Sequence, residues 1–357
     1  MDGHAQDMFS MMVKTSLTSY QVQIDTSLMA SQGKFDFLIV DNNILRGLGA
    51  SQIPTFAVSA TEATKNLETV GLILEKMHTA GLDRTSKVLV LGGGIVQDLA
   101  TITCSLFMRG VGWVYEPTTL TGMMDSCLGG KSSINVGLAK NLIGNFYPPL
   151  EVNISVAHLK TLPKFALIDG VAEGVKICFA RSEESFRDFL SSIPDPSEVG
   201  PSDLDTAIWL SLEAKKWFVE QDEFDKKERR LLNFGHTFGH ALESASGFKI
   251  SHGLSVALGM LAAIEFSGTS DVENVALLQR FCIRLLNPVS EEIQAKASSI
   301  DWEVFEKTIV ADKKNTPGFL HLILPDSYSV LQEVMLPLDD ELLQSASKSL
   351  KVAIERI

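Results

Sequence analysis

The first half of the chain alternates short apolar runs with a longer stretch of helical period. Phe37–Val40, Lys87–Leu91 and Trp113–Glu116 are short, apolar and rich in β-branched or aromatic residues, which is typical of buried parallel strands. Thr61–Ala80 has apolar residues at three- and four-residue spacing and predicts a helix capped by Thr61. The apolar stripe of this helix consists of Leu67, Val70, Leu74 and Met77. Strands alternating with helices indicate βαβ units and an open parallel sheet with helices on both faces.

Helical periodicity takes over from about Pro163. The proline-rich residues 192–202 predict a loop between helices, and Gly253–Ile264 predicts a buried helix because it is too short to cross a membrane. One further strand is expected near the end of the chain, at Phe319–Leu324. These features predict two domains, an α/β domain over residues 1–163 and a mainly helical domain over residues 164–357.

Composition and charge narrow the class of protein. Of 357 residues, 45% are hydrophobic and 21% charged, as in an ordinary globular protein and unlike a disordered chain. Acidic residues outnumber Lys and Arg by 44 to 31, a formal charge of −13, so a nucleic-acid partner is not expected. No apolar run reaches the ~18 residues of a membrane span, the N-terminus lacks a basic-then-apolar signal, and the four cysteines form no disulfide framework. We therefore expect a cytoplasmic protein with reduced thiols, in which a local basic cluster would hold any anionic ligand.

A glycine-rich turn lies between a predicted strand and a helix. In Leu91-Gly92-Gly93-Gly94-Ile95 the glycines let the backbone approach a pyrophosphate, and the helix that follows offers free N–H groups. The turn lacks the GxGxxG pattern, so a tight turn without a ligand is the alternative interpretation.

Three of the seven histidines lie close together in the sequence. His236 and His240 are four residues apart and share a face of a helix, and His252 follows. Neutral imidazoles one turn apart are good zinc ligands, and three histidines with a carboxylate would suit a catalytic metal. The HExxH glutamate of zinc proteases is missing, and a purely structural role is the alternative.

Basic side chains in the middle of the chain are candidates for holding an anion, although for any one of them a solvated surface charge is the favoured interpretation. They are Lys131, Lys140, Lys176, Lys215 and Arg229. Gly129–Ser132 resembles the end of a P-loop, but Asp125 stands where that motif needs its first glycine. Glu173 lies three residues before Lys176, which predicts a surface ion pair on one helix face.

Eight segments together resemble 3-dehydroquinate synthase, a family of the sugar-phosphate cyclase superfamily. They occur in the family's order from about Phe35 to Pro325, and their combination is specific although each piece alone is not. The segments are LGGGIVQDLA, MRG at Met108–Gly110, PTTL at Pro117–Leu120, DSCLGGKSSIN from Asp125, KNLIGNFYPP from Lys140, TLP at Thr161, GVAEGVK from Gly170 and LLNFGHTFGHALE from Leu231. The resemblance implies a Rossmann-like parallel-sheet domain that binds NAD, followed by a mainly helical domain that binds metal and substrate.

The resemblance also implies roles for individual residues. Glu173, His236 and His252 match the zinc ligands of the family, whereas His240, a ligand on spacing alone, matches a base that faces the substrate. Arg109 matches an arginine contributed by the partner subunit, which implies a homodimer. Other positions match substrate-binding residues: Lys131, Asn141, Lys176, Lys215, Arg229, Asn233, and Lys313 or Lys314. A further set matches cofactor-binding residues: Asp41, Asn43, Glu62, Lys65, Gly93, Gly94, Ile95, Asp98, Thr118, Thr119, Asp125, Lys140, Thr161 and Leu162.

The implied activity is that of a phosphate-eliminating lyase of the shikimate pathway. It converts 3-deoxy-arabino-heptulosonate 7-phosphate to 3-dehydroquinate and phosphate, with NAD used transiently and a divalent metal, Zn²⁺ or alternatively Co²⁺. The lysines and Arg109 would neutralise the phosphate, and a planar arginine suits a carboxylate. Converging cations thereby reconcile an acidic protein with a sugar phosphate.

Several residues depart from the family pattern. Gln97 replaces the usual glycine of the cofactor turn, and the other departures are Met123 and Met124, Ser132–Ile134, His158 and Phe165. They bear on the identity of the substrate more than on the reaction class.

Two other activities are alternatives. A sister cyclase would act on sedoheptulose 7-phosphate or another sugar phosphate, but Arg229, Asn233 and His240 favour the carboxylate-bearing substrate. A polyol or glycerol-phosphate dehydrogenase would also bind NAD and a metal, and would be recognised by net NADH production.

Overall fold

The computed structural model describes residues 9–25, 34–48, 53–137, 139–202, 204–312 and 314–357. The chain divides into two compact units. The first comprises the chain up to Leu162 together with Lys216–Phe224, and the second comprises Pro163–Lys215 and Asp225–Ile357. Within the described residues, no helix has both the length and the apolar character needed to cross a bilayer.

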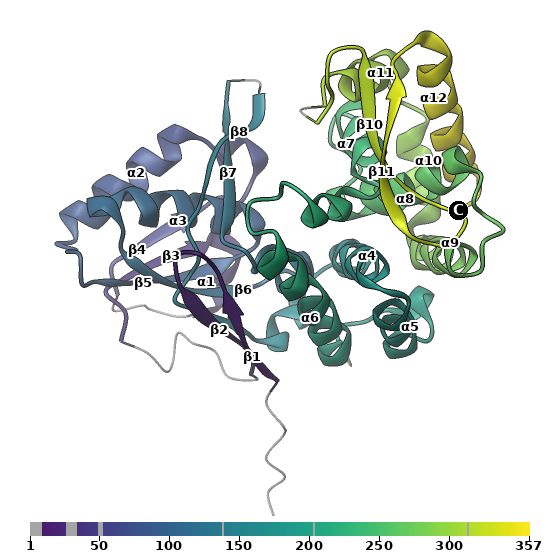
Figure 1. Cartoon of the computed structure of the whole chain (residues 1–357). Coiled ribbons are helices and arrows are strands. Elements are labelled where there is room, and N and C mark those ends of the chain that lie inside the picture. Colours follow the sequence, from purple (N-terminus) through teal and green to yellow (C-terminus); the bar gives the residue numbers. More distant parts are fainter. Residues whose placement is uncertain (1–8, 26–33, 49–52, 138, 203, 313) are drawn as a thin grey trace, which may run out of the picture. The chain divides into compact units, whose positions relative to one another are not determined.

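The first unit contains a seven-stranded sheet (Figure 1) in the order β1-β2-β9-β6-β5-β3-β4. Strand β1 is antiparallel to β2, and all other neighbours are parallel. The strands are β1 (Ser10–Lys14), β2 (Ser19–Ile24), β3 (Phe37–Asp41), β4 (Thr55–Val58), β5 (Lys87–Gly92), β6 (Gly112–Pro117) and β9 (Glu151–Ile154). The three predicted strands are therefore confirmed as β3, β5 and β6 in the middle of a parallel sheet.

Both faces of the central strands are buried. Leu38, Ile39 and Val40 of β3 and residues 88–91 of β5 are at most 2% exposed, as expected where helices cover both sides of a sheet. Ile44 and Leu45 of α1 (Asn42–Leu48) pack against the Leu38 face. Helix α3 (Gly94–Leu106) contacts β5, and α2 (Leu67–Thr79) packs on α3.

The predicted helix over Thr61–Ala80 is wrong at its start. Helix α2 begins at Leu67, where the Asn66 side chain accepts a hydrogen bond from Thr69 N (2.9 Å), whereas Thr61 precedes a separate short turn. Lys65 breaks the helix because its carbonyl accepts from the backbone N–H of Asn135 at 2.8 Å, which holds it in a non-helical conformation. Leu67 is accordingly exposed rather than part of the buried stripe.

A separate antiparallel hairpin, β7 (Lys131–Val136) with β8 (Ala139–Phe146), packs through β7 against α3. The four cysteines of the sequence all lie in the described part of the chain, as buried thiols outside any disulfide.

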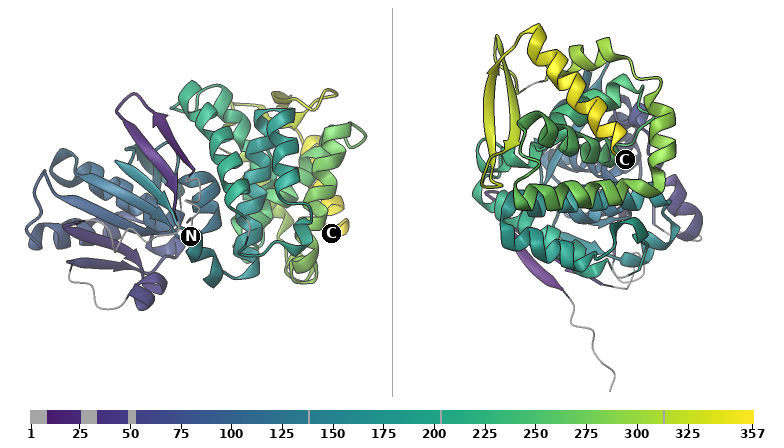
Figure 2. Two further views of the ribbon diagram at one scale, coloured as in Figure 1. Left: turned by 90° about the horizontal axis from the view of Figure 1, so that it is seen from below. Right: turned by 90° about the vertical axis from the view of Figure 1, so that its right-hand side faces the viewer.

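The second unit is mainly helical, as predicted. Its helices are α4 (Lys164–Arg181), α5 (Glu183–Ser192), α6 (Asp205–Gln221, of which residues 216–221 count with the first unit), α7 (His236–Ala245), α8 (His252–Ser267), α9 (Glu273–Leu286), α10 (Ser290–Ala297), α11 (Trp302–Val310) and α12 (Asp340–Glu355). The predicted buried helix is α8, which contacts α4, α7 and α12. Figure 2 shows α12 in yellow, lying across the other helices of this unit.

The expectation of a single strand near the end of the chain is wrong. Strand β10 (Phe319–Pro325) pairs in antiparallel fashion with β11 (Leu331–Pro337). Gln332 and Glu333 make β11 polar and largely exposed, so it lacked the apolar run that identified β10.

Candidate functional site

Most residues that match cofactor positions follow the carboxyl ends of parallel strands. Asp41 ends β3, Gly93 follows β5, Thr118 follows β6, and Thr161 ends the turn after β9. Strands β3 and β5 are neighbours in the sheet. The strand that follows β3 in the chain, β4, lies on one side of this pair, and the strand that follows β5, β6, lies on the other, so the strand order reverses between β3 and β5. Such a switch point at the carboxyl edge is where open α/β sheets bind ligands. The first unit therefore has the topology of a dinucleotide site at these residues.

The two glycines of the turn after β5 have different surroundings. A Cβ atom on Gly93 would lie 2.8 Å from Cγ2 of Thr119, so packing within the protein excludes a side chain there. Among the residues that the structure describes, and apart from its own helix backbone and adjoining residues, a Cβ atom on Gly94 would meet only Oγ of Ser126, at 3.9 Å. Helix α3 begins at Gly94 without a side-chain cap, so its first N–H groups can hold an anion. The open space at Gly94 fits the approach of a pyrophosphate.

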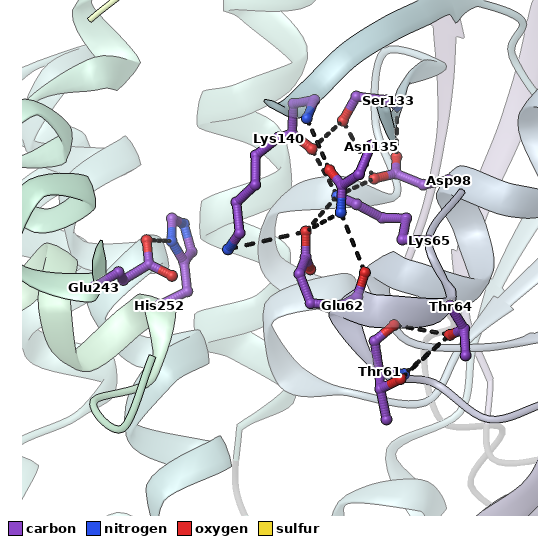
Figure 3. A network of polar contacts seen from close by, with 11 residues as sticks. Thr61, Glu62, Thr64, Lys65, Asp98, Ser133, Asn135, Lys140, Glu243 and His252 are labelled. Atoms are coloured by element: carbon purple, nitrogen blue, oxygen red, sulfur yellow. Dashed lines mark hydrogen bonds and ion pairs between the residues drawn. The ribbon is translucent and has the colours of Figure 1, made fainter. Parts of the chain in front are cut away.

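Lys65, itself buried, is the centre of a polar network in the first unit (Figure 3). Its Nζ lies 2.7 Å from Oδ1 of Asn141, 3.1 Å from Oδ2 of Asp98 and 3.6 Å from Oε1 of Glu62. Nζ of Lys140 lies 3.9 Å from the same Glu62 oxygen. The structure thus brings together five predicted site residues, and it places Asn141, matched to a substrate position, among residues matched to the cofactor.

Two residues of β7 that sequence reasoning missed complete this network. Ser133 N donates to Oδ1 of Asp98 at 3.2 Å, and Nδ2 of Asn135 donates to Oε1 of Glu62 at 2.9 Å. Burial raises the pKa of Asp98, and the charge and hydrogen bond of Lys65 oppose that rise. The two-residue period that puts Ser133 and Asn135 on one face of β7 was the available signal.

Arg109 lies on a strained turn. Met108 has φ 48° and Arg109 has φ 69°, both in the left-handed region that non-glycine residues rarely adopt. Nε of Arg84 donates to the Met108 carbonyl at 3.2 Å and helps to hold this conformation. Strain of this kind is typical of functional positions, which fits a projecting arginine.

The candidate metal ligands come together in the second unit. Glu173 lies on α4, His236 and His240 on α7, and His252 at the start of α8. Oε1 of Glu173 is 3.2 Å from Nε2 of His252 and 3.8 Å from Nε2 of His236. Ring nitrogens of the three histidines lie within 4.8 Å of one another.

Close packing of three helices produces this cluster. A Cβ atom on Gly259 would lie 2.0 Å from the carbonyl oxygen of Gly235, so only glycine lets α8 approach the start of α7. A Cβ atom on Gly253 would lie 2.3 Å from Cα of Asp169, so α8 approaches α4 as closely. These two contacts bring His252 to both Glu173 and His236.

The donor set fits a divalent metal. Tetrahedral zinc with bonds of ~2.0–2.2 Å holds its ligand atoms about 3.4 Å apart, close to the separations from Glu173 to the two histidines. Oε1 of Glu173 is fully buried without a hydrogen-bond partner in the described residues, whereas Oε2 accepts from Lys176. The predicted Glu173–Lys176 ion pair is present, but it is buried rather than on the surface.

The charges around Glu173 suit metal binding. Burial acts to raise the pKa of Glu173, but Lys176, His252 and His236 outweigh it and hold that pKa well below its usual range. Burial lowers the pKa of His236 strongly, with Lys176 adding to the effect. Desolvation by the surrounding protein and the charge of His252 lower the pKa of His240 to about 4. Both rings are therefore neutral at pH 7.

His252 carries a proton that a metal would displace. Desolvation by the surrounding protein acts to lower its pKa, but the nearby Glu173 and Glu243 carboxylates outweigh that effect and raise the pKa to about 10. Nδ1 of His252 lies 3.1 Å from Oε2 of Glu243, so it donates there and leaves Nε2 toward Glu173. Glu243 was missed from the sequence, although it follows His240 by three residues on the same helix face.

The remaining substrate candidates have varied surroundings. Lys215 and Arg229 are each 5% exposed, and Nδ2 of Asn233 donates to the Arg230 carbonyl at 2.9 Å. Lys314 N donates to Oδ1 of Asp312 at 3.1 Å, and Nζ of Lys314 lies 3.6 Å from Oδ2 of the same residue. Lys313, the alternative to Lys314, lies outside the described residues, and Lys131 is exposed at the start of β7.

Comparison with known proteins identifies the family. Residues 42–169 match the 3-dehydroquinate synthase N-terminal family, and residues 170–315 match the C-terminal family. The 3-dehydroquinate synthase of Alkaliphilus metalliredigens (strain QYMF) is 32% identical over 341 residues, which cover 89% of this chain and 93% of that protein. This chain belongs to the 3-dehydroquinate synthase family, a family of enzymes.

Solved structures of related cyclases share the fold. A 2-deoxy-scyllo-inosose synthase complexed with carbaglucose-6-phosphate, NAD⁺ and Co²⁺ has a TM-score of 0.81 at 21% identity, covering 97% of this chain and 100% of that one. The 2-epi-5-epi-valiolone synthase of Streptomyces hygroscopicus subsp. jinggangensis 5008, with NAD⁺ and Zn²⁺ bound, has a TM-score of 0.75 at 22% identity, covering 95% and 98%. The Rossmann-like and helical parts of this 3-dehydroquinate synthase family member thus have the expected fold.

The departures from the family pattern are accommodated by this chain's own packing. Gln97 is buried and hydrogen-bonds to Ser126, and His158 is buried against Glu116. Met123 and Met124 are fully buried, so they act as packing residues beside Asp125. Phe165 is 44% exposed at the start of α4.

Proposed function

We propose that this enzyme is a 3-dehydroquinate synthase that converts 3-deoxy-arabino-heptulosonate 7-phosphate to 3-dehydroquinate and phosphate. The observation that carries the proposal is the Glu173 oxygen facing His252 and His236 at 3.2 and 3.8 Å, in a chain of this family. Family membership gives the reaction class, and the buried donor set gives a place for the metal that the reaction needs.

Two groups would serve this reaction, NAD and a divalent metal, with zinc preferred and cobalt as the alternative. When bound, they supply a reversible hydride acceptor and a Lewis acid. Glu173, His236 and His252 would hold the metal, as the spacing of their ligand atoms supports. Residues at the carboxyl edge of the sheet would hold the dinucleotide: Asp41, Asn43, Glu62, Lys65, Gly93, Gly94, Ile95, Asp98, Thr118, Thr119, Asp125, Lys140, Thr161 and Leu162. The structures of two related cyclases with NAD⁺ and Co²⁺ or Zn²⁺ support this choice.

The chain's own residues bind and orient the substrate. Arg229 pairs with its carboxylate, and the lysine side chains neutralise its phosphate. His240 takes a proton from a substrate hydroxyl, and its pKa of about 4 keeps the ring neutral and able to accept at pH 7. The remaining substrate contacts come from Asn141, Asn233 and Lys314.

Several finer features belong to this proposal. Arg109 is contributed to the site of a partner subunit in a homodimer, as its strained turn supports. Residues 1–163 form the NAD-binding domain and residues 164–357 the domain for metal and substrate. The enzyme acts in the cytoplasm, in the shikimate pathway of aromatic amino acid biosynthesis.

The test is phosphate release, followed together with NADH absorbance, from 3-deoxy-arabino-heptulosonate 7-phosphate and from sedoheptulose 7-phosphate. We expect fast release from the first compound and no net NADH. Preference for sedoheptulose 7-phosphate would replace the proposal with a sister cyclase. Net NADH from glycerol or another polyol would replace it with a dehydrogenase.

A further inference from the structure

Gln97 and Ser126 join the first turn of α3 to the turn that contains Asp125. Nε2 of Gln97 donates to the backbone carbonyl of Ser126 at 2.6 Å, and Oγ of Ser126 donates to Oε1 of Gln97 at 2.6 Å. Gln97 is 2% exposed, whereas Ser126 is partly exposed. The two hydrogen bonds close a ring, so the Gln97 amide and the Ser126 hydroxyl hold each other in one orientation.

The direction of both bonds follows from the chemistry of the groups. A backbone carbonyl only accepts, so the amide nitrogen of Gln97 must face Ser126 O and its amide oxygen must face the hydroxyl. An amide oxygen also only accepts, so the Ser126 hydroxyl gives its proton to Gln97. Tyr115, another neighbour of Ser126, donates its own proton to the Gly92 carbonyl at 3.0 Å. The Ser126 proton therefore stays inside the protein, and toward a ligand its oxygen acts as an acceptor.

Ser126 borders the open space at Gly94. Its Oγ would lie 3.9 Å from a Cβ atom on Gly94, and within the described residues no other atom comes within 4 Å of that position apart from the helix backbone and the adjoining residues. A ligand that approaches the Gly94 backbone therefore passes this hydroxyl. A phosphate oxygen has no proton to donate, so it would meet the lone pairs of Ser126 unfavourably, whereas a hydroxyl or an amide N–H would form a hydrogen bond.

We infer that Ser126 is a further binding residue of the dinucleotide site proposed above, and that Gln97 is its positioning residue. Ser126 accepts a hydrogen bond from a donor group of the dinucleotide, either a ribose hydroxyl or the carboxamide N–H of the nicotinamide. Gln97 stands where the family pattern has glycine. By accepting the Ser126 proton, it leaves the Ser126 oxygen to act as the acceptor in this contact. Neither residue belongs to the cofactor set predicted from the resemblance.

The test is calorimetric titration of the full-length zinc-loaded protein with NAD⁺, without a sugar phosphate. Ser126→Ala should weaken NAD⁺ binding about fivefold, the effect of one neutral hydrogen bond. Gln97→Met should weaken binding in the wild type but add little in the Ser126→Ala background, because both changes remove the same contact. Thr101→Val is the matched control, since it deletes a buried hydroxyl that donates to the Gln97 carbonyl at 2.7 Å on the same helix. That variant should bind NAD⁺ like the wild type.

A second ligand separates the two donor groups. ADP-ribose keeps the ribose hydroxyls and lacks the carboxamide. If Ser126→Ala weakens ADP-ribose as much as NAD⁺, the donor is a ribose hydroxyl, and if ADP-ribose is unaffected, the donor is the carboxamide. Unchanged NAD⁺ binding in Ser126→Ala would overturn the inference. Gly94→Val distinguishes failure of this inference from failure of the proposed dinucleotide site. Unchanged NAD⁺ binding in Gly94→Val would mean that the dinucleotide site itself is elsewhere.

Discussion

Glu116 on β6 and His158 in the turn after β9 form a buried pair, with Nε2 of His158 2.6 Å from Oε1 of Glu116. Glu116 is 1% exposed and lies two residues before Thr118. The His158 carbonyl accepts from the Thr161 hydroxyl at 3.0 Å. The pair therefore connects two strand ends that carry residues of the proposed dinucleotide site.

Removing one partner of the Glu116–His158 pair should lower the free energy of unfolding more than removing both. His158→Val leaves the Glu116 carboxylate buried without this partner, which should cost about 3–5 kcal/mol of the free energy of unfolding. The double variant Glu116→Val/His158→Val removes both polar groups and should regain most of that loss. Urea denaturation of the wild type and of these two variants measures the loss and its recovery. Equal losses in the single and double variants would mean that the pair does not act as a unit.

Metal content should depend on His252 and on the carboxylate behind it. The purified wild type should hold about one divalent ion per chain, and His252→Ala should lose most of it. Glu243→Ala should lower metal affinity by about ten- to a hundredfold, because Nδ1 of His252 loses the acceptor that orients the ring. Glu265→Ala, on the same helix α8, is the control. Elemental analysis that finds one zinc per chain in His252→Ala would remove this residue from the ligand set.

The two glycines of the turn after β5, Gly93 and Gly94, should respond differently to substitution. Gly94→Val fills space that the fold leaves open, so it should weaken NAD⁺ binding while the protein stays folded. Loss of one charged hydrogen bond, worth ~1.5–3 kcal/mol, would weaken binding by about ten- to a hundredfold. Gly93→Ala should instead lower the melting temperature, because its methyl group meets Thr119. Calorimetry and thermal denaturation distinguish these effects, and the reverse pattern would contradict the assignment.

Substrate choice should depend on Arg229. If Arg229 pairs with a substrate carboxylate, Arg229→Leu should lower kcat/KM at least about tenfold to a hundredfold. Arg229→Lys should recover part of the loss, because an ammonium lacks the planar fork of a guanidinium. The preference for 3-deoxy-arabino-heptulosonate 7-phosphate over sedoheptulose 7-phosphate should shrink in Arg229→Leu. An unchanged ratio would mean that Arg229 pairs with an acid of the protein instead.

Stability should fall with rising pH because of Asp169. Its Oδ1 accepts from Ser251 Oγ at 2.7 Å and from Leu254 N at 2.8 Å, yet burial raises its pKa to about 6. Between the unfolded pKa of 3.8 and this value, the folded protein keeps a proton that the unfolded chain releases. The free energy of unfolding therefore decreases as pH rises through this window, by at most ~3 kcal/mol.

Asp169→Asn isolates this contribution, since an amide oxygen still accepts both hydrogen bonds. In urea denaturation at pH 4 and pH 7.5, the variant should lack the part of the decrease that Asp169 causes and should be the more stable protein at pH 7.5. Parallel pH dependence in the two proteins would show that Asp169 titrates normally.

The sequence predicted the centre of the sheet better than its edges. Strands β3 and β5 are buried on both faces, so they form continuous apolar runs that periodicity detects. Burial alternates along strand β2 (Ser19–Ile24), and strand β9 has only four residues. Both therefore contain too few apolar residues to be recognised as strands from the sequence. The start of α2 depended on Asn135, whose backbone N–H holds Lys65 and which lies far away in the sequence.

The residues of the candidate site likewise divide into those that the sequence revealed and those that it did not. Spacing alone grouped His236, His240 and His252, and the structure brings these rings together. Glu173 came from the family resemblance, because a glutamate on a separate helix has no local pattern that marks it as a ligand. Glu243 and Ser126 were missed because the roles proposed for them depend on distances between helices and turns, which packing determines.

The burial of all four cysteines makes the native protein a ready background for site-specific labelling. Burial raises the pKa of Cys178 and Cys282 to about 12 and also raises that of Cys104, so these side chains remain protonated thiols at neutral pH. A cysteine introduced at Tyr328, which is 84% exposed between β10 and β11, would react much faster with a maleimide dye. Fluorescence from that position could then report on the second unit without any change to the native cysteines.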